Sequence, residues 1–121
     1  MSEKKYIIFT DLKDFTYKNT LLTTSQIQAI LSEFHRLVQI TSERYEVKVL
    51  KSIGDAYFII SKNALSAYKF SSDLLQASLE YDASHKLEIK KISLRLTITY
   101  GSITQNISLS LEDYFGEAIN L

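Results

Sequence analysis

The alternation of apolar and polar residues predicts a first buried strand near the start of the chain. Tyr6 to Phe9 reads "YIIF", a short apolar run of the kind found in strands that are buried on both faces. A polar segment with two aspartates, "TDLKDFT", follows it. We therefore expect one internal strand that ends just before a loop rich in oxygen donors, with Asp11 leaving the strand two residues after Phe9.

Two later stretches show helical periodicity. Thr23 and Gln26 have the spacing of a capping box at the start of a long helix. Asn63 is placed as the N-cap of a second helix. The buried stripe of the first helix is predicted to contain Ile27, Ile30, Leu31, Phe34, Leu37, Val38, Thr41 and Tyr45. That of the second is predicted to contain Leu65, Tyr68, Leu74, Leu75, Ser78 and Leu79.

The segment from Val47 to Ile60, "VKVLKSIGDAYFII", predicts a β-hairpin. Its two apolar arms flank Gly54, which can supply the positive φ of the turn, and Asp55 sits at the tip. A further strand, "SLRLTITY", alternates Leu94, Leu96, Ile98 and Tyr100 with polar residues and is expected to close at Gly101. Residues 107–111, "ISLSL", alternate again and are expected to pair back on it.

The order β-α-β-β-α-β predicts an α+β fold of the ferredoxin-like type, an antiparallel sheet with both helices on one face. In this topology the first strand is central and pairs with the outgoing arm of the hairpin. The end of the first strand therefore lies beside the hairpin tip, so Asp11 and Asp55 are brought together. Two such carboxylates repel each other and favour a divalent cation such as Mg²⁺ or Mn²⁺. Alternatively, Asp55 is only a turn residue and Lys51 a strand-edge lysine.

Composition narrows the choice of function. The 121 residues carry 14 basic and 14 acidic side chains, with neither a basic face for nucleic acid nor a polybasic cluster for a membrane surface. There is no cysteine for a disulfide or a thiolate zinc site. The only histidines, His35 and His85, are interpreted as structural. Without a signal peptide or a long apolar run in this sequence, we expect a cytoplasmic domain.

Three stretches resemble successive motifs of the class III nucleotidyl cyclase catalytic domain. They are "IIFTDLKDFT", "KVLKSIGDAYFII" and "LEDYFGEAIN", in the family's order and covering nearly the whole chain. The resemblance implies a palm-type catalytic domain over residues 1–121. It also implies that Asp11 and Asp55 bind two metal ions, Mg²⁺ or Mn²⁺.

The resemblance further implies roles in substrate recognition. Lys51 and Asp113 match the purine-reading pair of adenylate-forming members, in which lysine donates to N1 of adenine and aspartate accepts from the 6-amino group. Asn120 matches the asparagine that orients the ribose in the transition state. The implied reaction converts ATP to 3′,5′-cyclic AMP and pyrophosphate by two-metal phosphoryl transfer. The implied assembly is a head-to-tail homodimer with its sites at the interface.

The chain departs from the family pattern in two places. Asp14 stands where the family usually has glycine, and we expect it to cap the following helix, with a third metal ligand as the alternative. The family places an arginine four positions after the asparagine, whereas this sequence ends at Leu121, so we expect a C-terminally truncated domain of low activity.

Three further readings therefore stay open. One is a catalytically silent regulatory or nucleotide-binding module. Another is a bare ferredoxin-like interaction domain. The third is a palm domain similar to diguanylate cyclases, although "IGDAY" lacks the second glycine and the glutamate of their turn.

Overall fold

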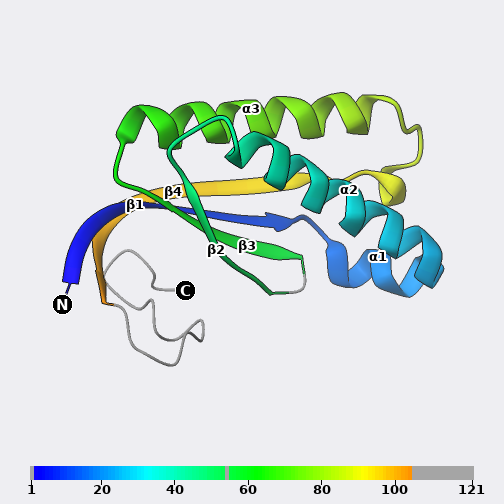
Figure 1. The fold of residues 1–121 in the computed structure, drawn as a ribbon. Coiled ribbons are helices and arrows are strands. Elements are labelled where there is room, and N and C mark those ends of the chain that lie inside the picture. The colour runs from blue at the N-terminus through cyan, green and yellow to red at the C-terminus, as the bar shows by residue number, and fades with distance from the viewer. Residues whose placement is uncertain (1, 54, 105–121) are drawn as a thin grey trace.

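The computed structural model describes residues 2–53 and 55–104. The described elements are four strands and three α-helices, which Figure 1 labels, and one 3₁₀ turn. In chain order they are β1 (Ser2–Leu12), α1 (Phe15–Leu21), α2 (Thr24–Ser42), β2 (Lys48–Ile53), β3 (Ala56–Ser61), α3 (Ala64–Ala83), η1 (Glu88–Lys90) and β4 (Leu94–Thr104).

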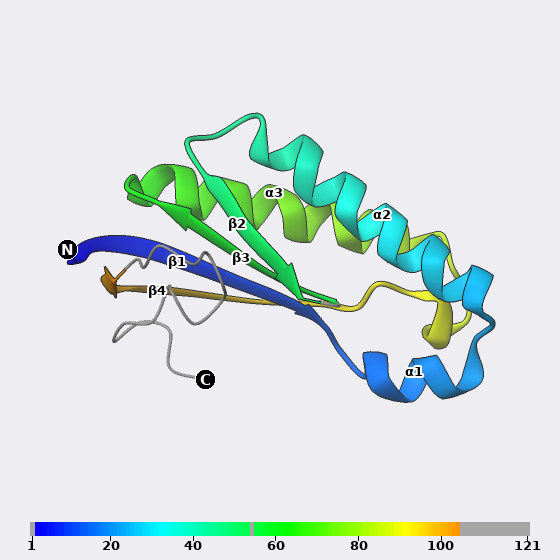
Figure 2. The same cartoon turned by 60° about the horizontal axis from the view of Figure 1, so that its bottom comes forward.

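The predicted ferredoxin-like topology is confirmed. The strands lie in the order β2-β3-β1-β4, and each neighbouring pair is antiparallel. The helices α2 and α3 lie side by side over one face of this sheet (Figure 2). Because β1 is hydrogen-bonded on both sides, Ile8 lies opposite Ile59 of β3 and opposite Ile98 of β4.

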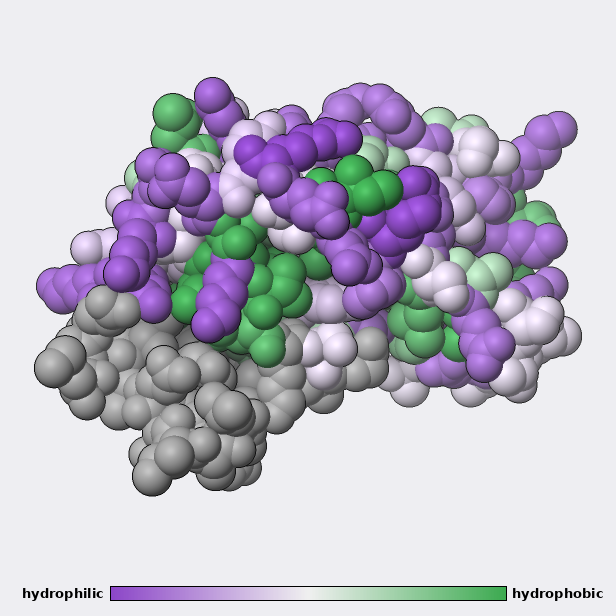
Figure 3. All heavy atoms as spheres, in the orientation of Figure 1, coloured by the Kyte–Doolittle hydropathy of each residue, from purple (hydrophilic) through white to green (hydrophobic). Residues whose placement is uncertain are grey.

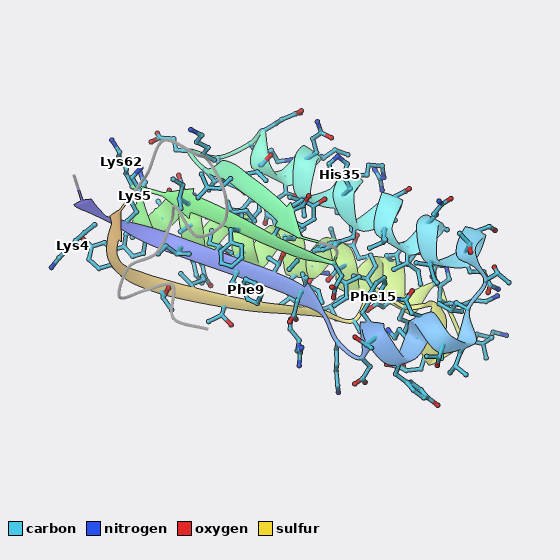
Figure 4. The ribbon with its side chains drawn as sticks, turned by 90° about the horizontal axis from the view of Figure 1, so that it is seen from below. Lys4, Lys5, Phe9, Phe15, His35 and Lys62 are labelled. Atoms are coloured by element: carbon cyan, nitrogen blue, oxygen red, sulfur yellow. The ribbon has the colours of Figure 1, made fainter. Side chains whose placement is uncertain are left out.

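Both faces of β1 are apolar, as the sequence predicts. Ile8 points into the main core between the sheet and the helices, where Phe34, Phe70 and Leu74 are also almost fully buried. A second, smaller cluster consists of Ile7, Phe58 and Ile60, with Phe9 and Leu50 packed against it. The Phe9 and Phe58 ring centroids are 4.8 Å apart. Figure 4 views the sheet from the side away from α2 and α3, where Phe9 is labelled.

The helix α2 begins and packs as its sequence predicts. The Thr23 hydroxyl accepts a hydrogen bond from the Gln26 amide, and the Gln26 side chain accepts from the Thr23 amide, which completes the capping box. Residues of the predicted stripe that are buried are Ile30, Phe34, Leu37, Val38 and Thr41. At the far end, the Tyr45 hydroxyl donates a short hydrogen bond to Asp73 of α3.

The predicted buried face of α3 is largely wrong. Asn63 caps the helix as expected, accepting from the amides of Leu65 and Ser66. The face that packs on the sheet, however, contains Ala67, Phe70, Ser71, Leu74, Ser78 and Asp82. Four residues of the predicted stripe, Leu65, Tyr68, Leu75 and Leu79, are between 40% and 66% exposed. The helix carries two apolar stripes, and the one with small residues faces the sheet because it allows close approach.

The strands differ from the prediction mainly in length. β1 continues to Leu12, so Asp11 lies within the strand rather than after it. β4 continues through Gly101 instead of closing there. Leu94 and Leu96 are half-buried, as the alternation suggests, but Ile98 and Tyr100 are exposed. Figure 3 shows small hydrophobic patches among hydrophilic side chains on one face of the molecule. The predicted strand at residues 107–111 lies outside the described residues.

The two leucine environments on α3 give a matched test of the packing. We expect Leu74→Ala to lower the free energy of unfolding by about 2–5 kcal/mol, since it leaves a cavity beneath the helix. We expect Leu79→Ala, the same change on the outer face, to alter it by no more than about 0.5 kcal/mol. Urea denaturation followed by circular dichroism measures both. Equal losses in the two variants would contradict the assignment of the buried face.

Candidate functional site

A polar cavity of about 550 Å³ opens where β1 ends and α1 begins. Its walls come from β1, α1, the β2–β3 turn and the start of β4. The lining residues are Asp11, Leu12, Asp14, Phe15, Thr16, Tyr17, Thr20, Asp55 and Arg95. The predicted meeting of Asp11 and Asp55 is therefore seen, since both line one cavity although they lie far apart in the sequence.

The sheet register explains this arrangement. Thr10 of β1 pairs with Tyr57 of β3, so the turn that carries Asp55 lies beside the end of β1. The main-chain amide of Leu12 donates to Oδ2 of Asp55 across a distance of 3.4 Å. On the other side of β1, Asp11 is directly opposite Arg95 of β4. The central position of β1 thus gathers residues from both neighbouring strands.

Arg95 forms a two-point ion pair with Asp11. Its Nε lies 2.9 Å from Oδ1 of Asp11, and its terminal nitrogen lies 3.0 Å from Oδ2. The hydrogen bond to Asp11 raises the pKa of Arg95, and the negative charges of Asp11, Asp14 and Asp55 act in the same direction. The Arg95 side chain is still 61% exposed, so its guanidinium remains accessible to a ligand. An exposed pair of this kind contributes little to stability.

Arg95 is the functional candidate that the sequence analysis did not identify. In "SLRLTITY" it occupies an ordinary outward position of an alternating strand. The signal that could have identified it is the register: a residue of β4 that pairs with Asp11 must lie at the same edge of the sheet. The short helix α1, which supplies Thr16, Tyr17 and Thr20 to the cavity, was also not predicted.

Asp14 takes the N-cap position of α1, but its carboxylate does not form the predicted cap. No side-chain cap hydrogen bond is present, and its main-chain carbonyl accepts instead from the Lys18 amide at 2.9 Å. The residue is left-handed, with φ 58°. This conformation is the one that glycine adopts most readily, which accounts for a glycine at this place in the resembled motif. The Asp14 carboxylate lines the cavity.

Of the other predicted site residues, the structure describes only the backbone of Lys51. The backbone of Lys51 lies in β2 opposite Phe58, beside a register shift between Val49 and Lys51. Asp113 and Asn120 lie outside the described residues, so their predicted roles stay predictions. The alternative of Lys51 as a strand-edge residue agrees with the position of β2 at the edge of the described sheet.

The donors at the cavity are those that suit a hard cation. Asp11, Asp14 and Asp55 offer carboxylate oxygens, which Mg²⁺ and Mn²⁺ prefer. Within residues 2–53 and 55–104, however, no group of three or more His, Cys, Asp or Glu side chains could hold a metal ion. An ion at Asp11 and Asp55 would thus need ligands from water or from a substrate, as Mg²⁺ commonly does.

Both histidines make contacts within the fold, in keeping with their structural interpretation. Nδ1 of His35 lies 2.6 Å from the hydroxyl of Tyr57, and the two rings are stacked at an angle. Nδ1 of His85 lies 2.9 Å from the main-chain oxygen of Tyr81. Figure 4 shows His35 on α2, and this residue does not line the cavity that contains Asp11 and Asp55, here called the aspartate cavity.

Comparison with known proteins gives the family of this chain. Residues 2–121 match the family described as "Adenylate and Guanylate cyclase catalytic domain". The chain belongs to this cyclase family. It is 26% identical over 125 residues to the speract receptor of Strongylocentrotus purpuratus, covering 94% of this chain and 11% of that protein. It thus spans only a small part of this curated relative.

Solved cyclase structures share the fold. A bacterial light-regulated adenylyl cyclase superposes with a TM-score of 0.83 and 17% identity, over 98% of this chain and 38% of that one. The monomeric guanylyl cyclase domain of the RhoGC fusion protein from Blastocladiella emersonii gives a TM-score of 0.76 and 21% identity, over 98% of this chain and 72% of that one. Both adenylyl and guanylyl cyclases are therefore similar in fold, and the comparison leaves the purine open.

Membrane association is a separate matter. Within the part of the chain that the structure describes, none of the helices has the combination of length and apolar character that is needed to cross a bilayer.

The geometry predicts that Asp55 can be changed without harm to the fold. Its one described hydrogen bond is the long contact from the Leu12 amide, which an asparagine oxygen could also accept. We expect Asp55→Asn to change the free energy of unfolding by less than about 1 kcal/mol. In contrast, Asp82→Asn should cost about 2–3 kcal/mol, because both oxygens of that buried carboxylate accept main-chain amides. Chemical denaturation measures both, and a large loss for Asp55→Asn would mean that this aspartate is structural.

Proposed function

We propose that this cyclase-family chain is an adenylate cyclase domain that converts ATP to 3′,5′-cyclic AMP and pyrophosphate. The observation that carries the proposal is the common cavity of Asp11, Asp55 and Arg95, which combines two carboxylates for metal ions with a cation for phosphate oxygens. These parts are what a phosphoryl transfer needs, because positioning and charge neutralisation supply most of its acceleration.

Asp11 and Asp55 are proposed to hold two ions, Mg²⁺ or Mn²⁺. Their oxygen-only donor set fits these metals, and the open cavity leaves room for a triphosphate to complete the coordination. When bound, such ions activate the attacking 3′-oxygen of the ribose and neutralise the charge that develops on the phosphates. The work of the chain is to keep both carboxylates at the end of β1 and to admit the triphosphate there.

Arg95 is proposed to contact the triphosphate once Asp11 binds metal. In the structure its guanidinium neutralises Asp11 from two points. A metal ion at Asp11 would take over that neutralisation, and the guanidinium could then donate to phosphate oxygens, which it matches in geometry as well as in charge. In this proposal Arg95 first pairs with Asp11 and then, after metal binding, with the triphosphate.

The choice of ATP rests on Lys51 and Asp113. Their resemblance to the purine-reading pair of adenylate-forming cyclases supports adenine, and Asn120 is proposed to orient the ribose. In the family the purine readers face the metal aspartates across a dimer interface. We propose a head-to-tail homodimer in which the purine readers of one copy face Asp11 and Asp55 of the other.

A second candidate is a catalytically silent member of the family that binds nucleotide or a partner cyclase. One observation favours it: the two-point pairing with Arg95 engages both oxygens of Asp11, the carboxylate that a metal would require. Metal-dependent nucleotide binding is common to both candidates. Turnover belongs to the first alone.

Asp55→Asn tests the metal assignment. The amide removes one of the two charges that would hold the ions, so in a complete domain we expect Mn²⁺-dependent formation of cyclic AMP to fall to background while the fold persists. The readout is cyclic AMP by chromatography, with circular dichroism alongside. Glu80→Gln, the same type of change at an exposed position of α3, is the control and should keep full activity. Unchanged turnover in Asp55→Asn would defeat the assignment.

Purine selection is tested by the pair Lys51→Glu and Asp113→Cys. Guanylate cyclases typically carry glutamate and cysteine at the matching positions, so the double variant should lose preference for ATP over GTP. The ratio of kcat/KM for the two nucleotides with Mn²⁺ measures this. An unaltered ratio would count against the purine-reading role, whichever nucleotide the parent protein prefers.

A further inference from the structure

Lys18, in the middle of α1, is a charged residue in an unusual place. Its side chain is only 4% exposed. Its Nζ donates to the main-chain oxygen of Lys91 at 2.9 Å and to Oγ of Ser93 at 3.1 Å. Both acceptors belong to the segment that leads into β4. The lysine therefore joins α1, one wall of the aspartate cavity, to the segment that precedes Arg95.

Ser93 is held from three sides. Its Oγ accepts from Lys18, its carbonyl accepts from the Lys13 amide at 2.9 Å, and its amide donates to Oδ2 of Asp82 at 3.0 Å. Its φ is 54°, in the left-handed region that a non-glycine residue avoids. Such a conformation persists only where its surroundings enforce it, and it commonly marks a functional site.

The two non-glycine residues with positive φ among the described residues are Asp14 and Ser93. They lie on the two segments that Lys18 connects: Asp14 lines the cavity itself, and Ser93 is close in sequence to the lining residue Arg95. Asp14 precedes the cavity wall of α1, while Ser93 is two residues before Arg95. Both residues with left-handed backbone therefore lie on the segments that connect Lys18 with the cavity.

Burying the ammonium of Lys18 has an electrostatic cost that its contacts must offset. Burial lowers the pKa of its ammonium, although Glu88, Asp82 and Asp14 oppose the shift and Lys13 adds to it. The net direction means that the charged form is less favourable here than in water. The hydrogen bonds to the Lys91 carbonyl and the Ser93 hydroxyl offset this cost, and an apolar side chain of similar size would leave both acceptors without that donor.

We propose that Lys18 is a positioning residue that fixes the start of β4 against α1 and thereby sets Arg95 opposite Asp11. Arg95 can form both hydrogen bonds to Asp11 only if β4 pairs with β1 in the observed register. The hydrogen bonds from Lys18 to Lys91 and Ser93 fix the segment that precedes β4. Asp82 of α3 accepts further hydrogen bonds from the same segment. Lys18 itself does not line the cavity.

The first arm of the test examines the tether without reference to catalysis. In Lys18→Met we expect the amide hydrogens of Lys13 and Ser93 to exchange about tenfold faster, because the segment loses hydrogen bonds from a charged donor. The Ile59 amide in the sheet should keep its protection. Hydrogen exchange followed by NMR measures all three. Lys69→Met, the same change at an exposed position of α3, is the control and should leave them unaltered. Unchanged exchange at Lys13 and Ser93 would overturn the proposal.

The second arm rests on the proposed function and uses a double-mutant cycle. The probes are 3′-deoxy-ATP and 3′-deoxy-GTP with Mn²⁺, which lack the attacking oxygen, and calorimetry gives Kd for the one that binds more tightly. We expect Arg95→Ala to weaken binding about tenfold in the parent protein but only about twofold in the Lys18→Met background, since coupled residues are not additive. Equal effects in both backgrounds would mean that Lys18 does not position Arg95.

The two experiments distinguish failure of the Lys18 proposal from failure of the proposed function. If neither probe binds the parent protein, the proposed function fails and the exchange arm alone decides the role of Lys18. If Lys18→Met loses Ile59 protection as well, Ser93→Gly replaces it, since glycine accepts the left-handed backbone and removes one acceptor of Lys18. Unchanged Lys13 exchange in Ser93→Gly would then overturn the proposal.

Discussion

The antiparallel pairing of β1 with a strand on each side is the constraint on which the rest of the structure depends. Hydrogen bonding to β3 brings the β2–β3 turn beside the end of β1, and hydrogen bonding to β4 places Arg95 opposite Asp11. A slip of one residue in either register would turn every side chain of that strand to the other face. The apolar clusters on both faces of β1 resist such a slip, so the core indirectly sets the geometry of the polar cavity.

The cavity brings together like charges that repel one another and one charge of opposite sign. Asp11, Asp14 and Asp55 place three negative charges around one opening, and Arg95 offsets part of that charge. Because the opening faces water, the repulsion is moderate and the fold can tolerate it. The remaining negative charge would favour a cation at this opening, in line with the proposed role of Asp11 and Asp55.

The sequence was sufficient for the topology and for the meeting of Asp11 and Asp55, because both follow from strand order and from where turns fall. It was insufficient for Arg95, whose partner depends on a register that alternation cannot reveal. The buried face of α3 was mistaken because Leu65, Leu75 and Leu79 repeat as regularly as the true core residues. Only contact with the sheet distinguishes the two stripes, since Ala67, Ser71 and Ser78 allow a closer approach.

α1 escaped prediction for a different reason. A helix of seven residues is too short for periodicity to be visible, and the residue it buries is the lysine Lys18. A pattern that treats lysine as polar and exposed must misread that position. The proposal of Asp11 and Asp55 as metal ligands rests on chemistry and topology together, while the roles of Asp113 and Asn120 rest on resemblance alone.

The full-length pairing of β1 with β4 has a consequence for how the protein is made. Ser2 pairs with Thr104 and Leu12 with Leu94, so β1 finds this partner only after the helices and the hairpin between the two strands have been synthesised. Contacts between such distant segments form late and slow the folding of a domain. During translation β1 must remain without β4, with its apolar side chains exposed to other nascent chains. Assembly of the cavity, which needs Asp11 and Arg95 together, therefore waits for the synthesis of β4.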